Sequence, residues 1–260
     1  MLSLTCHGDN LKPALVMIHG FLGSKADWIL MLPELSRHFY CICIDLPGHG
    51  DSPRLSFATP AFYQIATAVQ QSISTLSIDK YHLLGYSLGG RISLHIARQY
   101  SEHVLSLHLE STHLGLTSTR DKEARLKNDR MWNSRLTSLK MNEFLNAWYQ
   151  QGVFSDLAEI PRQALVAKRS NNCALGLRSI YLTTSLAVQE DLSQLPNLIS
   201  TPCHYYVGKD DSKFLTLALH WQSQSCLTVH QFERAGHNVH LAAMDKFCQQ
   251  LLLQLTENPQ

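Results

Sequence analysis

The sequence predicts an α/β fold in which a mostly parallel, doubly wound sheet is covered by helices on both faces. Two observations support this. Short, continuous apolar runs alternate with amphipathic stretches through the first half of the chain, and the same alternation returns near its end. Continuous apolar runs are typical of strands buried on both faces, and the helices between them provide the crossovers that parallel strands need.

The apolar runs give the order of the elements. Strands are predicted at residues 15–19, 40–46, 81–86, 104–109, 204–207 and 227–232, and helices at 27–37, 60–76, 88–100 and 241–255. From about 117 to 189 the sequence is helical in character, without strand-like runs. We interpret residues 115–190 as a helical cap insertion over the C-terminal edge of the sheet, where open α/β sheets hold their sites. Residues 1–260 are thus predicted to form a single domain.

Composition and charge exclude several classes of protein. The chain has 260 residues, 45% of them hydrophobic and 17% charged, and a formal net charge of +1. No block of like charge indicates a nucleic-acid or membrane surface, and no feature indicates an obligate protein partner. The N-terminus has neither a basic start nor an apolar core, and no apolar run approaches the ~18 residues that cross a bilayer. We therefore expect a cytoplasmic protein.

The cysteines and histidines give no sign of a metal site. The seven cysteines are scattered and mostly lie inside apolar runs, so reduced thiols are expected rather than a disulfide framework. His237 and His240 have the spacing of a metal-binding pair, but no cluster supplies a third ligand. We expect neither a metal nor a cofactor.

The strongest local signal is G-Y-S-L-G at residues 85–89, between a predicted strand and a predicted helix. In this G-x-S-x-G pattern the glycines allow a cramped turn, which lifts the hydroxyl of Ser87 out of the sheet. The pattern in this context is typical of the nucleophile elbow of the α/β-hydrolase fold.

A serine hydroxyl needs a histidine and a carboxylate to become reactive, and this fold supplies them in the order serine, acid, histidine. Asp210 and Asp211 follow the predicted strand 204–207, and His237 follows the last predicted strand. The G-x-x-D spacing favours Asp211, with Asp210 as the alternative. The predicted catalytic triad is Ser87, Asp211 and His237.

A loop after the first predicted strand completes the site. Its sequence, H-G-F-L-G at residues 19–23, can turn a backbone N–H group inward. Together, the N–H groups of Phe21 and Leu88 would form an oxyanion hole.

Arginines indicate the charge of the substrate. Arg91 lies four residues after Ser87 on the same predicted helix, so both project from one face. The insertion adds Arg125 and Arg169, together with Arg130 and Arg135, which we expect on a solvated helix face. Several carboxylates on a small-molecule substrate would suit such guanidinium groups.

At these residues the chain resembles the MenH family, the 2-succinyl-6-hydroxy-2,4-cyclohexadiene-1-carboxylate (SHCHC) synthases of menaquinone biosynthesis, within the α/β-hydrolase superfamily. The general motifs are HGFLG (19–23), DLPGHGDS (45–52), GYSLGGR (85–91) and RAGHN (234–238). The more specific ones are DRMW (129–132), WYQQ.VF (148–154), RSNN (169–172), TSLAVQ.DL (184–192) and DSKF (211–214). The resemblance covers nearly the whole chain.

The resemblance implies a carbon–oxygen lyase rather than a hydrolase. The expected reaction is the 2,5-elimination of pyruvate from 2-succinyl-5-enolpyruvyl-6-hydroxy-3-cyclohexene-1-carboxylate (SEPHCHC), which bears three carboxylates, to give SHCHC. By resemblance, the substrate-binding residues are Tyr86, Arg91, Arg125, Trp148, Phe154 and Arg169. Two alternatives stay open: a serine hydrolase acting on an anionic substrate, and a binding protein of the same fold that has lost catalysis.

Overall fold

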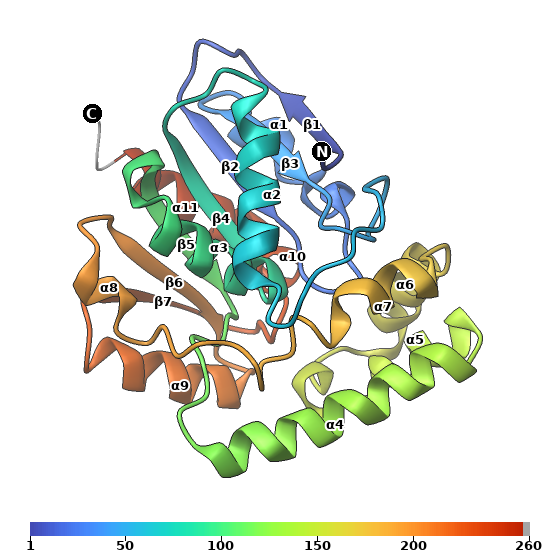
Figure 1. Cartoon of the computed structure of the whole chain (residues 1–260). Helices are drawn as coiled ribbons and strands as arrows, with labels where there is room; N and C mark the ends of the chain where they lie inside the picture. The colour runs from blue at the N-terminus through green and yellow to red at the C-terminus, as the bar shows by residue number, and fades with distance from the viewer. Residues whose placement is uncertain (257–260) are drawn as a thin grey trace.

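The computed structural model describes residues 1–256, in which seven strands form one sheet in the order β1-β3-β2-β4-β5-β6-β7 (Figure 1). β1 runs antiparallel to β3, and the other neighbouring pairs are parallel. The strands are β1 (Leu4–His7), β2 (Ala14–Ile18), β3 (Tyr40–Ile44), β4 (Tyr81–Tyr86), β5 (Val104–Glu110), β6 (Cys203–Gly208) and β7 (Leu227–Phe232). The mostly parallel sheet predicted from the sequence is therefore present.

Helices connect the parallel strands. The α-helices are α1 (Leu32–Leu35), α2 (Phe62–Ser74), α3 (Leu88–Gln99), α4 (Thr119–Ser138), α5 (Met141–Trp148), α6 (Glu159–Arg169), α7 (Ala174–Tyr181), α8 (Leu195–Leu198), α9 (Ser212–Gln222), α10 (Val239–Ala242) and α11 (Met244–Thr256). Short 3₁₀ helices are η1 (Lys25–Trp28), η2 (Ser101–His103) and η3 (Gly152–Phe154). Within residues 1–256, no helix has both the length and the apolar character needed to span a membrane.

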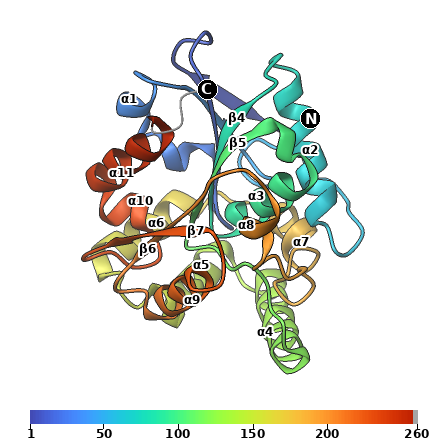
Figure 2. The same ribbon diagram turned by 90° about the vertical axis from the view of Figure 1, so that its left-hand side faces the viewer.

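The inner strands β2 to β6 are buried on both faces, as their continuous apolar sequences require. Side chains alternate along each strand, so Val16 and Ile18 of β2 pack toward α2, α3 and α9, whereas Leu15 and Met17 pack toward α1 and α11. Figure 2 shows α1 and α11 on one side of the sheet and α2 and α3 on the other. Two separate apolar layers thus sandwich the sheet.

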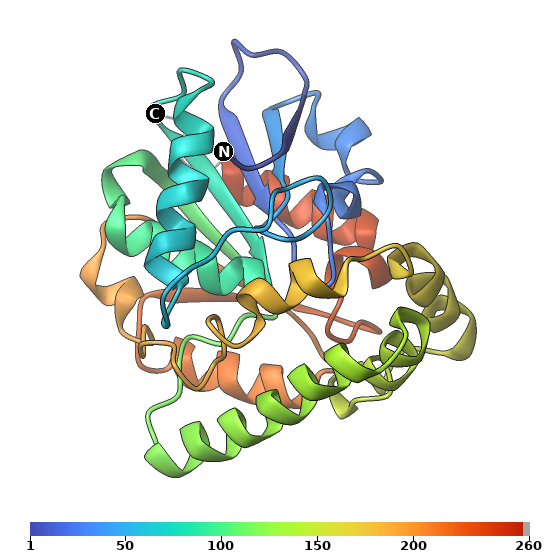
Figure 3. The same ribbon diagram turned by 45° about the vertical axis from the view of Figure 1, so that its right-hand side comes forward.

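The helical insertion lies between β5 and β6. Helices α4 to α7 are beyond the C-terminal ends of the strands (Figure 1), and Figure 3 shows α7 between the sheet and α4. The insertion has a core of its own, in which Trp132, Phe144 and Leu177 are buried. This core also includes Leu22, from the loop after β2, so the insertion packs directly on a loop at the strand ends.

Some local predictions differ from the structure. The helix expected at 27–37 is broken into η1 and the short α1, because Pro33 lacks the N–H that a continuous helix would need. The helix expected at 241–255 is two helices, α10 and α11, separated at Ala243. β1 was not predicted, because it is a short edge strand whose residues are all only partly buried.

Candidate active site

The turn between β4 and α3 holds Ser87 in a strained conformation. Its φ is 51° and its ψ is −108°, a region that L-residues rarely adopt. A Cβ atom at Gly89 would lie 2.2 Å from the carbonyl oxygen of Ile18, and one at Gly85 would lie 2.6 Å from the Cα of Gly90. Only glycine fits at either position, because the strand and the helix approach each other so closely.

The structure brings Ser87, Asp211 and His237 together from three different loops. The Nδ1 atom of His237 lies 2.7 Å from Oδ2 of Asp211, and its Nε2 atom lies 3.4 Å from Oγ of Ser87. Hydrogen bonds between catalytic groups are often this long in free enzymes and shorten when substrate binds. Asp211 fixes the imidazole so that Nε2 faces the hydroxyl.

Asp211, and not its neighbour Asp210, contacts the imidazole. Asp211 is the N-cap of α9, and its Oδ1 atom accepts a hydrogen bond from the N–H of Phe214. Its other oxygen thereby stays directed at His237. Both acids line the cavity described below, but among the described residues only Asp211 has a hydrogen-bond contact with His237.

Two backbone N–H groups next to Ser87 are free to donate. Among residues 1–256, no acceptor pairs with the N–H of Phe21 or of Leu88. Both residues line a small hollow of about 80 Å³ together with Ser87. Leu88 is the first residue of α3, where the helix dipole also favours negative charge. The pair could therefore stabilise a developing oxyanion.

A cavity of about 520 Å³ opens beside Ser87 and His237, under the insertion. Trp148 and Phe154 line it. The ring centroids of Phe154 and His237 lie 5.7 Å apart, and the two rings form a T-shaped pair. Three cations also line it, Arg91, Arg125 and Lys213, together with three acidic residues, Asp129, Asp210 and Asp211.

Arg91 is held beside Ser87 without a carboxylate partner. Its Nη1 atom donates to the carbonyl oxygen of Thr184 at 2.8 Å, and its guanidinium carbon lies 5.5 Å from the ring centroid of Phe62. Within residues 1–256, no acidic side chain forms an ion pair with it. Burial, and then the nearby Arg125, lower the pKa of Arg91 to about 9, so it stays cationic at neutral pH. Arg91 is thus a buried cation without an ion-pair partner next to the candidate nucleophile or base, and the negative charge of Asp129 offsets only part of the effect of burial on its pKa.

Arg125 and Lys213 form, together with Arg91, what we call the basic wall of the cavity. The Nε atom of Arg125 donates to both oxygens of Asp129, at 2.8 and 2.9 Å, which leaves its terminal amino groups without an acceptor among the described residues. Burial, and then the positive charge of Arg125, lower the pKa of Lys213. Sequence reasoning gave Lys213 no role, although it lies within the DSKF motif, directly after the candidate acid.

Two of the expected substrate-binding residues are not among those that line the cavity. The guanidinium of Arg169 is buried against Asp27, Tyr149 and the carbonyl of Leu22. The ring of Tyr86 lies behind His237, and its hydroxyl donates to Oδ1 of Asn238 at 2.7 Å. Their motifs predicted nearness to the site but could not show which way each side chain points. Arg130 and Arg135 are exposed, as expected.

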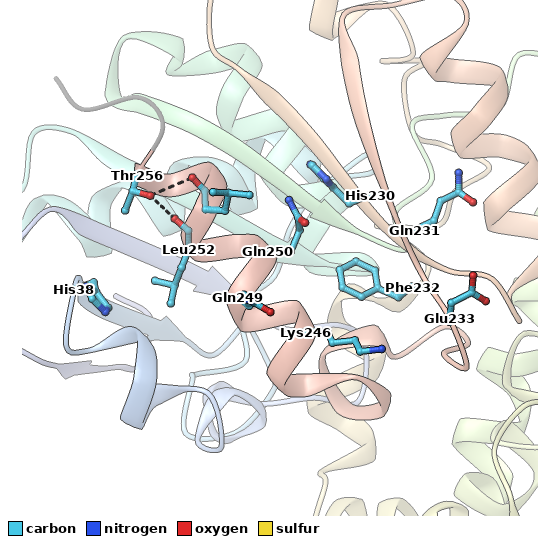
Figure 4. A pocket seen from close by; sticks show the side chains of 11 residues that line it. His38, His230, Gln231, Phe232, Glu233, Lys246, Gln249, Gln250, Leu252 and Thr256 are labelled. Atoms are coloured by element: carbon cyan, nitrogen blue, oxygen red, sulfur yellow. Dashed lines mark hydrogen bonds between the residues drawn. The ribbon is translucent and has the colours of Figure 1, made fainter.

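A larger hollow of about 840 Å³ lies elsewhere, between β7 and α11. Figure 4 shows Lys246, Gln249 and Gln250 of α11 and His230 and Phe232 of β7 around it. No triad residue borders it, so the chemistry belongs to the smaller cavity. Within the described part of the chain, no group of three or more His, Cys, Asp or Glu side chains could hold a metal ion.

Comparison with known proteins shows the family to which the chain belongs. The family model of the alpha/beta hydrolase fold matches residues 13–243. The 2-succinyl-6-hydroxy-2,4-cyclohexadiene-1-carboxylate synthase of Yersinia pseudotuberculosis serotype O:1b (strain IP 31758) is 37% identical over 247 residues, which are 95% of this chain and 88% of that protein. The chain belongs to the SHCHC synthase family.

Solved structures place this SHCHC synthase family member within a broad fold. MenH from S. aureus matches with a TM-score of 0.91 at 22% identity, and the match covers 99% of each chain. A carboxylesterase of Nitrososphaera gargenis matches with a TM-score of 0.83 at 17% identity, over 98% of this chain and 95% of that one. Because both likenesses are in fold alone, the reaction must be argued from the site.

Proposed function

We propose that this member of the SHCHC synthase family eliminates pyruvate from SEPHCHC to give SHCHC, with Ser87, His237 and Asp211 as its catalytic triad. The observation that carries the proposal is the basic wall of the cavity, in which Arg91, without a carboxylate partner, lies one helical turn from Ser87. An uncharged ester would leave this buried charge without an ion-pair partner, whereas a carboxylate of a tricarboxylate would supply one. We place the reaction in the cytoplasm, which the seven free cysteines support.

The first step is proton abstraction. His237 accepts the hydroxyl proton of Ser87 through Nε2, and Asp211 stabilises the resulting imidazolium through Nδ1. Ser87 takes the ring proton next to the succinyl carbonyl, which that carbonyl makes acidic. Serine therefore acts as a general base, and no acyl-enzyme forms.

The second step moves electrons around the ring. Charge builds on the succinyl carbonyl oxygen, where the N–H groups of Phe21 and Leu88 stabilise it. The pair from the broken C–H bond forms a double bond between ring carbons 2 and 3, and the original alkene shifts to carbons 4 and 5. The bond from carbon 5 to oxygen then breaks, and enolpyruvate takes up a proton and becomes pyruvate.

Pyruvate release from freshly made SEPHCHC, coupled to lactate dehydrogenase, tests the proposal. We expect stoichiometric pyruvate and little turnover of a p-nitrophenyl ester, because the basic wall disfavours an uncharged acyl group. Burst-type hydrolysis of the ester without pyruvate release would instead identify a serine hydrolase. Binding of the tricarboxylate without turnover would identify a binding protein.

Arg91→Ala is expected to lower kcat/KM by ~10–1000-fold, because it removes a cation that a substrate carboxylate would pair with inside the cavity. Lys213→Ala should raise KM ~10-fold or more through the loss of a second such cation. Steady-state pyruvate release measures both effects. The matched control is Arg130→Ala, which removes an exposed arginine from the same helix as Arg125 and should change neither constant. Wild-type kinetics in Arg91→Ala would contradict the proposed polycarboxylate site.

A further inference from the structure

The loop that carries the Phe21 N–H group has a shape that must be held in place. We call residues 19–24, between β2 and η1, the oxyanion loop. Leu22 has a φ of 69°, in the left-handed region that a leucine disfavours, and it is almost fully buried. Because the local sequence does not favour this conformation, contacts from elsewhere in the fold must fix it.

The direction of the Phe21 N–H group is set by the peptide bond that precedes it. The carbonyl oxygen of Gly20 accepts the N–H of Gly23 at 3.0 Å and lies 2.7 Å from Nδ1 of His19. Nε2 of His19 accepts the N–H of Leu46, so Nδ1 carries the proton and donates. In a trans peptide the N–H points opposite to the C=O, so fixing the Gly20 carbonyl aims the Phe21 N–H.

The next residue is fixed on both sides. The N–H of Leu22 donates to Nε2 of His49 at 3.2 Å. Its carbonyl oxygen accepts two hydrogen bonds from the insertion, one from Nη1 of Arg169 at 2.8 Å and one from Nδ2 of Asn172 at 2.9 Å. The insertion therefore binds the oxyanion loop through the main-chain carbonyl of Leu22.

The other two nitrogen atoms of Arg169 also donate hydrogen bonds. Its Nη2 atom pairs with Oδ2 of Asp27 at 2.8 Å, and its Nε atom donates to the hydroxyl of Tyr149 at 3.2 Å. The same Asp27 oxygen accepts the N–H of Ser24, at the end of the oxyanion loop. Burial alone would raise the pKa of Asp27, but the Arg169 guanidinium and other nearby cationic groups hold it below its usual range.

We propose that Arg169 and Asn172 are positioning residues, which clamp the oxyanion loop to the insertion and so hold the Phe21 N–H toward the developing oxyanion. This role deepens the proposed function and rests on it. It replaces the substrate-binding role that the family resemblance implies for Arg169. A substrate carboxylate could reach that guanidinium only by displacing Asp27 and the Leu22 carbonyl, whereas Arg91, Arg125 and Lys213 already face the cavity.

The clamp predicts a defect in turnover without a defect in binding. Arg169→Gln and Asn172→Ala should each lower kcat by about 10–100-fold and change KM by less than about 3-fold, because a misdirected donor fails mainly in the transition state. Arg169→Lys should recover part of the activity. The matched control is Lys168→Gln, which removes the neighbouring cation that pairs with Asp27 at 3.0 Å but does not hold Leu22. It should leave kcat unchanged.

A second readout does not depend on catalysis. In protein with ¹⁵N-labelled Phe and Leu, the amide signals of Phe21 and Leu22 should shift in Arg169→Gln and Asn172→Ala but not in Lys168→Gln. If Arg169→Gln fails to fold, Asn172→Ala decides alone, since it leaves the buried ion pair intact.

The outcomes separate the clamp from the proposed function. Unchanged amide signals of Phe21 and Leu22 in the clamp variants would contradict the clamp. So would an Arg169→Gln variant in which KM rises as much as it does in Arg91→Ala while kcat is unchanged. If the wild-type enzyme releases no pyruvate from SEPHCHC, the proposed function is wrong. In that case the amide shifts would still decide whether the clamp exists.

Discussion

Ser87→Ala is expected to lower kcat for pyruvate release by ~10³–10⁴-fold, with a change in KM of less than about 3-fold. The substitution removes the only atom that, in the proposed mechanism, contacts the ring proton, while the cations that hold the carboxylates stay in place. Coupled pyruvate release measures both constants. Equilibrium binding of SHCHC to the variant provides the control, because unchanged affinity shows that the cavity is intact.

His237→Ala should cause a similar loss, and the double variant with Ser87→Ala should be little worse than either single one. The two groups act as one unit through the contact between Nε2 and Oγ, so their effects are not additive. Activity within tenfold of wild type in either single variant would contradict the triad. A covalent adduct on Ser87 in quenched mass spectra with the natural substrate would contradict the general-base role.

The order of strands and helices, and the loops that carry the site residues, could be predicted from the sequence because both follow from local patterns. Apolar runs mark the parallel strands, and in a parallel sheet all strands end at one edge. Residues that directly follow strands, such as Ser87 after β4 and Asp211 after β6, must therefore meet there. The edge strand β1 has no such pattern, because its residues are only half-buried.

The roles of the arginines could not be read in this way. Arg91 follows Ser87 by one turn of α3, so its place near the hydroxyl is local information. Arg169 lies far along the chain from Asp27 and Leu22, and nothing near it in sequence shows that it pairs with them. Lys213 presents the opposite case: its motif is visible in the sequence, but the direction of its side chain depends on how α9 packs on β6 and β7. Sequence spacing predicts which residues come close, and tertiary packing decides which of them face the substrate.

Buried histidines make the fold sensitive to acid. His82, His108 and His204 lie on neighbouring strands, and the hydroxyl of Ser106 lies 2.7 Å from a ring nitrogen of each of the first two. His204 stacks on His108 with 5.0 Å between ring centroids. Burial lowers the pKa of His82 to about 4. Burial, and then the neighbouring His230, lower the pKa of His204 to about 4. Burial and neighbouring histidines also hold the pKa of His108 well below its usual value. All three imidazoles are thus neutral in the native state.

We expect the free energy of unfolding to fall steeply between pH 6.5 and about pH 4. In that window these histidines are protonated in the unfolded chain, whose histidine pKa is ~6.5, but not in the native one. The stability they contribute is complete above pH 6.5 and is lost as the pH falls toward 4. Each costs about 1.4 kcal/mol per pH unit, so the three together cost about 4 kcal/mol per unit. From pH 6.5 to 4 the loss is about 10 kcal/mol, which is comparable to a typical total of about 5–15 kcal/mol, so we expect acid unfolding near pH 4.

Urea unfolding at about pH 7, 6.5, 6 and 5, followed by circular dichroism, measures this slope. His204→Phe should reduce it by about one proton, because the titrating group is lost while the ring stack is kept. The substitution removes an Nε2 atom without a hydrogen-bond partner and also the 3.2 Å contact of Nδ1 with Nε2 of His230. His220→Gln, at an exposed position, controls for the loss of a histidine as such. A fall of less than about 1.4 kcal/mol between pH 6.5 and 5 would show that the buried imidazoles take up protons without unfolding. His82, His108 and His204 would then carry positive charge in the native sheet, and their close packing would need a counter-ion.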